Sequence, residues 1–152
     1  MGHREQSMAF NEAAIALNRR LPEGRMNLAT ALSNQADWYL RLDQFDRALA
    51  AAAESLAIRE ELFGANASPL AFAHSRLAQI HLGASNVTAA LEHSHRALDI
   101  AGATLAPDHS DFQFHYRQHG LAVLHAGRVD EAVETLRRAV AVARRHFPAS
   151  HM

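Results

Sequence analysis

Histidine is the residue type with the most chemical potential in this sequence, with 11 copies in 152 residues. His115 and His119 lie four residues apart, and His74 and His81 lie seven apart, so each pair shares one face of a helix. Zinc, however, needs three or four converging ligands, often with a carboxylate among them. No His-Glu-x-x-His motif is present, and no acidic residue accompanies His115 and His119 at that spacing. We therefore predict no metal site and interpret these histidines as hydrogen-bonded packing residues in helix interiors.

Packed histidines predict a pH-dependent fold, because the imidazole titrates between about pH 5 and 8. We expect the thermal stability to fall between about pH 7.5 and 5.5. A flat profile over that range would contradict this interpretation.

Side chains for other kinds of catalysis are missing. The sequence has no glycine-rich phosphate loop, no Gly-x-Ser-x-Gly motif and no carboxylate pair in an apolar setting. With no cysteine, it has no thiol nucleophile, no thiolate zinc site and no disulfide. We therefore predict a protein that is not an enzyme, with no catalytic residue and no cofactor. A histidine-based metal or catalytic site is the alternative from a different functional class.

The charged residues give no reason to expect nucleic acid or a membrane as a partner. There are 15 basic residues, all arginine, and 16 acidic ones, for a net charge of −1. The most basic stretch, around Arg137, Arg138, Arg144 and Arg145, follows an acidic helix start, an order that complements the helix dipole. No aromatic residue is interleaved with it to stack on bases. No run of about 18 apolar residues and no signal peptide is present, so we expect a cytoplasmic protein.

The elements that must position these side chains are helices. Alanine, the best helix former, occurs 32 times, whereas glycine occurs 7 times and proline 4 times. No useful run alternates apolar and polar residues, so no strand is predicted. The composition indicates an all-α protein whose helices pack closely through small side chains.

Two series of residues recur along the chain with a period of 42. One series is an alanine near the start of a helical segment, and the other is a large apolar residue where a helical pattern ends. Each period reads as two helices joined by a short polar turn, and such a pair must stack on another pair to bury its apolar faces. The first series is Ala48, Ala90 and Ala132, preceded by twelve residues by Ala36, Ala78 and Gly120, and the second is Leu21, Phe63, Leu105 and Phe147.

This order of small residue, large apolar residue, turn and Ala-Leu resembles the tetratricopeptide repeat (TPR), whose usual period is about 34 residues. The 42-residue period and the linker Leu105-Ala106-Pro107-Asp108-His109 resemble the kinesin-light-chain-like subclass, which also occurs in many bacterial signalling proteins. The resemblance implies an all-α, right-handed superhelical solenoid of antiparallel helix pairs with about seven helices. His74, His81 and His119 depart from the family pattern, which prefers large apolar residues there.

We expect one TPR-like domain over residues 1–152. Helices are expected at 4–21, 26–41, 45–62, 69–83, 87–104, 110–126 and 130–146. Segment 4–21 is then a lone second helix, 26–62, 69–104 and 110–146 are complete repeats, and 147–152 is a linker or tail. We expect Ser68 to cap the helix that begins at Pro69, and Asp108 or Ser110 to cap another.

In this family, the first helix of each pair lines a concave groove that takes an extended peptide or a partner helix. Arginine forks suit carboxylates, and amide side chains can hydrogen-bond a peptide backbone. The resemblance implies a groove for an unidentified protein or peptide partner. The groove residues would be Asn34, Asp37 and Arg41 in the first repeat, Phe72, Arg76 and Gln79 in the second, and Phe114, Arg117, Gln118 and His125 in the third, beside Ser33, Ser75 and Leu121.

The two ends of the sequence leave two interpretations open. The first helix lacks its pair, and the chain closes in a linker with no polar capping helix, although solenoids need such caps. Either the chain is a fragment of a longer array, or another copy covers its ends. We therefore expect a non-catalytic binding scaffold, a module of a larger bacterial signalling or regulatory protein. The alternative is a homodimerisation module that pairs through its uncapped terminal helices.

Overall fold

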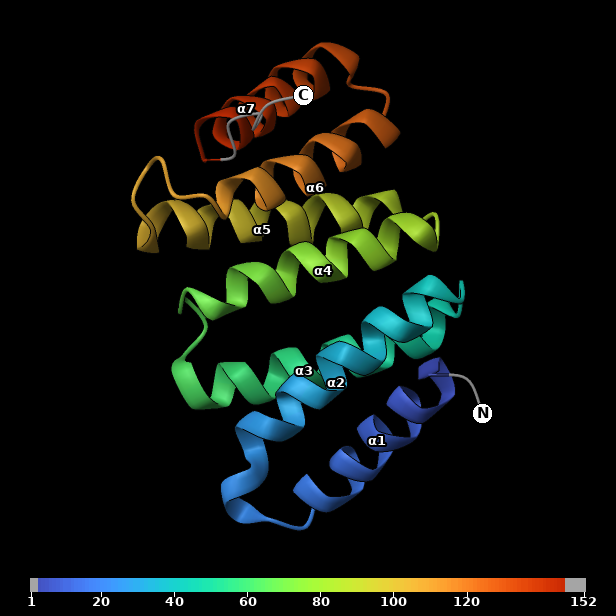
Figure 1. Cartoon of the computed structure of the whole chain (residues 1–152). Coiled ribbons are helices and arrows are strands. Elements are labelled where there is room, and N and C mark those ends of the chain that lie inside the picture. The colour runs from blue at the N-terminus through green and yellow to red at the C-terminus, as the bar shows by residue number, and fades with distance from the viewer. Residues whose placement is uncertain (1–2, 147–152) are drawn as a thin grey trace. The chain divides into compact units, whose positions relative to one another are not determined.

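The computed structural model describes residues 3–146, which form helices and no strands (Figure 1). The prediction of an all-α fold is confirmed. The predicted segment 147–152 lies outside the described residues. The elements are α1 (His3–Asn18), the short 3₁₀ helix η1 (Pro22–Gly24), α2 (Arg25–Arg41), α3 (Phe45–Phe63), α4 (Pro69–Gly83), α5 (Val87–Thr104), α6 (Phe112–His125) and α7 (Val129–His146).

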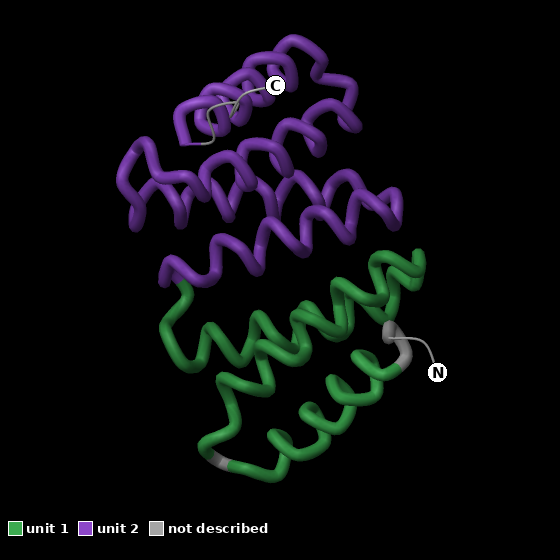
Figure 2. Tube along the Cα trace, viewed as in Figure 1, with its two compact units in different colours: residues 1–65 green, residues 66–152 purple. Residues whose placement is uncertain are grey.

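The helices group into two compact units, residues 1–65 and residues 66–152 (Figure 2). In unit 1, α1 packs on α2, and α2 pairs with α3. In unit 2, α4 pairs with α5 and α6 pairs with α7, while α6 also packs against α4 and α5. None of the described helices is both long and apolar enough to cross a membrane.

The turn inside each helix pair is built the same way three times. In each pair, a residue with positive φ follows the first helix: Asp43 at 55°, Ser85 at 59° and Gly127 at 79°. The N–H of the next residue then donates back to a carbonyl five residues earlier, from Gln44 to Tyr39 at 2.9 Å, Asn86 to His81 at 2.8 Å and Arg128 to Val123 at 3.1 Å. This left-handed cap satisfies the last carbonyls of a helix and reverses the chain. The 42-residue period therefore extends to backbone conformation.

Small residues sit where the paired helices approach each other. Ala48 and Ala90 are fully buried and Ala132 is 1% exposed, so the three recurring alanines share one environment. The smallest residue, Gly120, faces the largest partner, because a Cβ added to it would lie 2.7 Å from Leu136 Cγ. The size lost at one position is filled from the opposite helix, as close packing requires.

Two predicted helix caps are wrong. Ser68 precedes α4 as expected, but it has helical dihedral angles (φ −45°, ψ −41°) and its side chain makes no capping hydrogen bond. A capping side chain needs an extended backbone to reach the next N–H groups. Helix α6 begins at Phe112, and the residue before it is Asp111, not Asp108 or Ser110. A side-chain cap is present instead on α5, where Asn86 accepts a hydrogen bond from the Ala89 N–H at 3.3 Å.

Candidate functional site

Two aromatic rings and two arginines meet on α4 and α6 in unit 2. The rings of Phe72 and Phe114 stack with their centroids 5.5 Å apart. The guanidinium carbons of Arg76 and Arg117 lie 5.6 Å and 5.4 Å from the Phe114 centroid. Such contacts orient an arginine while its outer N–H groups stay available for an anion. Phe72 is 43% exposed, so the cluster faces solvent.

The cluster adjoins an open cavity of about 410 Å³ between the same two helices. Gln118 is the buried polar residue of its wall: it is 1% exposed, and its Oε1 has no hydrogen-bond partner among the described residues. A buried amide without partners is costly, so a ligand that bonds to it is favoured. The cavity is lined by Gln79, Leu82, Gly83, Arg117, Gln118, Leu121 and His125.

The charge of the two wall helices has one sign. Neither α4 nor α6 contains an aspartate or a glutamate, and each carries one arginine, Arg76 or Arg117. Arg76 donates a hydrogen bond to Gln79 Oε1 at 3.1 Å, which holds it beside the cavity. Anionic groups are the natural complement of such a surface.

The histidines behind this surface add little positive charge. His115 is fully buried, and its Nδ1 lies 2.8 Å from Ser75 Oγ in a hydrogen bond. Burial lowers the pKa of His115 to about 4, although the nearby Asp111 carboxylate acts in the opposite direction. His115 is therefore neutral at pH 7 and acts as a packing residue, as the sequence predicted.

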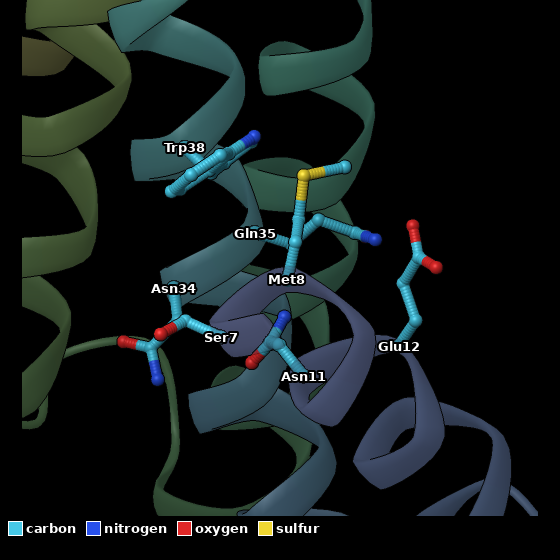
Figure 3. Close-up of a pocket in the computed structure, with 7 residues that line it drawn as sticks. All are labelled: Ser7, Met8, Asn11, Glu12, Asn34, Gln35 and Trp38. Carbon is cyan, nitrogen blue, oxygen red and sulfur yellow. The ribbon is translucent and has the colours of Figure 1, made fainter. Parts of the chain in front are cut away.

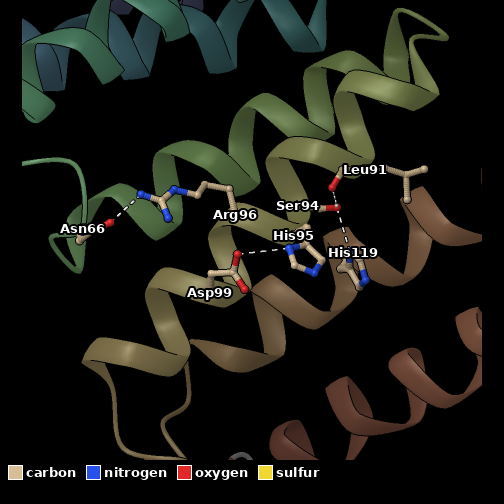
Figure 4. A network of polar contacts seen from close by, with 7 residues as sticks. All are labelled: Asn66, Leu91, Ser94, His95, Arg96, Asp99 and His119. Carbon is tan, nitrogen blue, oxygen red and sulfur yellow. Dashed lines mark hydrogen bonds and ion pairs between the residues drawn. The ribbon is translucent and has the colours of Figure 1, made fainter.

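The described histidines do not converge on a metal. His119 Nδ1 lies 3.0 Å from Ser94 Oγ on α5, so His119 and His115 hydrogen-bond to different helices (Figure 4). His95 instead meets the Asp99 carboxylate at 3.2 Å on the surface of α5 (Figure 4). Within residues 3–146, no three or more histidine, aspartate or glutamate side chains are placed to hold a metal ion together.

Unit 1 contains a second cavity, of about 210 Å³, between α1 and α2 (Figure 3). Asn34 lines it, whereas Asp37 and Arg41 lie further along α2 and are not among its lining residues. The indole Nε1 of Trp38 is buried there without a hydrogen-bond partner among the described residues. The lining residues are Ser7, Met8, Asn11, Glu12, Asn34, Gln35 and Trp38.

The predicted groove residues are thus divided between the units. The structure gathers those of the second and third repeats on α4 and α6 of unit 2, either in the aromatic cluster or around the cavity: Phe72, Arg76, Gln79, Phe114, Arg117, Gln118 and His125. The other three lie on α2 of unit 1: Asn34, Asp37 and Arg41.

Sequence analysis missed some cavity residues. The period of 42 could have found Gly83, because it is the counterpart of the predicted His125. No sequence signal pointed to the α1–α2 cavity, since it depends on how Met8 and Trp38 are placed in space.

Comparison with protein families identifies the class. Two family models, both described as Tetratricopeptide repeat, match residues 27–68 and 69–145. The chain belongs to the tetratricopeptide repeat family. No curated protein matches it significantly.

Solved structures show the same fold at low sequence identity. BtubC (BKLC) from P. vanneervenii is 21% identical with a TM-score of 0.81, over 97% of this chain and 59% of that chain. The nearly identical TPR-like repeats of a P. anserina kinesin light chain are 17% identical with a TM-score of 0.75, over 93% of this chain and 68% of that one. A double mutant of MamA RS-1 is 15% identical with a TM-score of 0.62, over 94% and 71%. The chain therefore spans 59% of the length of BtubC.

Proposed function

We propose that this chain is a non-catalytic protein-interaction scaffold, and that the α4–α6 groove of unit 2 binds an extended acidic peptide segment of a partner protein. TPR repeats indicate a protein-interaction scaffold, and the family and fold are typically non-catalytic. The groove, the peptide and its acidity go beyond the family and rest on the geometry of unit 2.

One observation carries the proposal: two arginines held against an aromatic pair, on helices that contain no carboxylate of their own. A guanidinium group binds a carboxylate through two parallel hydrogen bonds, which gives both affinity and orientation. The stacked Phe72 and Phe114 rings supply an apolar surface for one side chain of the peptide. The Gln118 amide in the adjoining cavity supplies a hydrogen-bonding group for its backbone.

The wider setting is also a proposal. We infer a module of a larger bacterial signalling or regulatory protein in the cytoplasm. It is supported by the 42-residue period, by the chain's spanning 59% of BtubC and by the absence of cysteine.

The test is peptide selection from a random displayed library against the wild-type chain. Selected peptides should be rich in aspartate and glutamate, and their affinity should fall about tenfold in Arg76→Ala/Arg117→Ala, since two charge-assisted contacts are lost. The matched control is Arg138→Ala/Arg145→Ala, which removes the same charge from α7 and should bind within about twofold of wild type. Circular dichroism checks that both variants fold. Equal affinity in both double variants would remove the groove assignment.

Self-association through the terminal helices is the second candidate function. Phe10 and Leu17 on α1 are 77% and 59% exposed, more than isolated surface positions require. Light scattering at two protein concentrations decides it: a mass that stays at 16.7 kDa at both counts against self-association.

A further inference from the structure

The outer face of α7 carries an apolar depression that the proposed peptide groove does not use. Val129, Val133 and Val140 are 55%, 42% and 48% exposed. An open cavity of about 520 Å³ lies on this face, lined by Val133, Leu136, Arg137, Val140, Ala141 and Arg144.

The same face of the preceding repeat is covered by a helix. On α5, Ser94 and His95 face α6: Ser94 Oγ hydrogen-bonds His119 at 3.0 Å, and the His95 and His119 rings meet edge to face with centroids 6.0 Å apart (Figure 4). The residues 42 positions later are Leu136 and Arg137, and both line the depression on α7. The depression therefore has the position and character of a seat for a helix.

The arginines of α7 indicate which kind of helix would fit. Arg128 pairs with Glu131 at 2.5 Å, Arg138 with Glu134 at 3.4 Å and Arg145 with Asp108 at 3.9 Å. The two arginines that border the depression, Arg137 and Arg144, form no ion pair with any residue in the described part of the chain.

The spacing of this pair defines the complement. Seven helical residues separate two side chains on one face by about 10.5 Å. Carboxylates seven residues apart on an antiparallel or parallel helix would face both guanidinium groups, with apolar side chains between them in the depression.

We propose that this face of α7 docks an amphipathic helix of a partner protein, with large apolar residues on one face and two flanking carboxylates seven residues apart that pair with Arg137 and Arg144. An anionic membrane fits less well, because the first turn of α7 carries Asp130 and Glu131 and its exposed apolar residues are valines and alanines, not aromatic anchors. A second copy seated α7 on α7 would bring arginines of like charge into the same apolar contact.

The probe is a fluorescein-labelled helical peptide of about 18 residues, the length of α7, with leucines on one face and two glutamates seven residues apart. Fluorescence anisotropy with the wild-type chain should show saturable binding that weakens as salt is raised. The same peptide with both glutamates replaced by glutamine should bind about tenfold more weakly, as expected for the loss of two ion pairs.

Three variants separate the outcomes. Arg137→Gln/Arg144→Gln should weaken the glutamate peptide about tenfold, whereas Arg138→Gln/Arg145→Gln, also seven residues apart on α7, should leave it within about twofold. Val133→Asp/Val140→Asp should abolish detectable binding while circular dichroism stays unchanged. Equal binding by both arginine variants, or by both peptides, would overturn the proposal. So would self-association of the wild-type chain that Val133→Asp/Val140→Asp removes, or cosedimentation with phosphatidylserine vesicles that Arg137→Gln/Arg144→Gln removes.

Discussion

Buried imidazoles are the residues of this chain whose charge state depends most on the fold. Burial lowers the pKa of His74 to about 4, and the charges of His93 and Arg96 act in the same direction. His93 sits between two other rings, with its Nδ1 3.0 Å from His74 Nδ1 and its ring stacked on that of His81. Protonating one ring of this group would place a cation beside the next. Burial also lowers the pKa values of His81, His93, His115 and His119.

These shifts predict that acid destabilises the protein. In the unfolded chain, histidine takes up its proton near pH 6.5, whereas His74 and His115 in the fold do so only near pH 4. Between these values the unfolded state binds more protons, so the free energy of unfolding falls as pH falls, by about 1.4 kcal/mol per pH unit for each fully shifted ring. The loss from these two rings should be small above about pH 7.5 and complete below about pH 4.

Urea unfolding at a series of pH values measures this loss. The slope of stability against pH near pH 5 should decrease by about one proton in His115→Asn. The exposed His125 supplies the control, and His125→Gln should keep the wild-type slope. Equal free energies of unfolding at pH 7.5 and pH 5 would contradict the interpretation.

Among helices, three glycines separate the ways in which backbone and packing set stability. Gly102 in α5 has no atom within 4 Å of an added Cβ, so Gly102→Ala should stabilise the protein by about 0.5–1 kcal/mol. Gly127 is equally open but has φ +79°, so Gly127→Ala should cost about 1–2 kcal/mol through backbone strain alone. Gly120→Ala should cost about 1–3 kcal/mol, because its Cβ would overlap Leu136.

Thermal and urea unfolding rank the three variants against wild type. Adding Leu136→Ala to Gly120→Ala should cost less than the sum of the two single changes, because the alanines at Ala36 and Ala78 stand opposite small residues, Ala52 and Ser94. Equal effects of Gly102→Ala and Gly127→Ala would refute the role assigned to the turn.

Helix positions followed closely from the sequence, because the repeat fixes them in three independent copies. The helix ends followed less well. Helix α1 ends at Asn18, not at residue 21, since Arg20 and Leu21 already make tighter bonds to Leu17 and Asn18 ahead of Pro22. Ser68 has the right type for a cap but the wrong dihedral angles, which no residue name reveals.

At the scale of the whole molecule, sequence period located groove positions but not their contacts. That Phe72 and Phe114 occupy equivalent sites was visible in the sequence, whereas the stacking of both arginines on Phe114 depends on side-chain directions on two helices. The division of the chain after Ala65 was likewise not visible, because the 42-residue period runs through it unchanged.

Unit 2 contains its own core and should therefore fold by itself. Its buried residues include Leu70, Ile80, Ile100, Phe112 and Val123, which come from three helices of that unit. Two complete helix pairs stack there, which meets the requirement that a pair bury its apolar faces on a neighbour. We expect residues 66–152 expressed alone to be helical and to unfold cooperatively.

The pH dependence provides a stricter test of the same claim than helicity does. Every histidine whose pKa the fold lowers, among the described residues, belongs to unit 2. If the isolated unit keeps its native packing, its stability should fall with acid with the same slope as the full chain, and His115→Asn should reduce that slope equally in both. A loosely packed helical fragment would hydrate these rings, so helical circular dichroism with a flat pH profile between pH 7.5 and 5 would show that native packing of unit 2 requires residues 1–65.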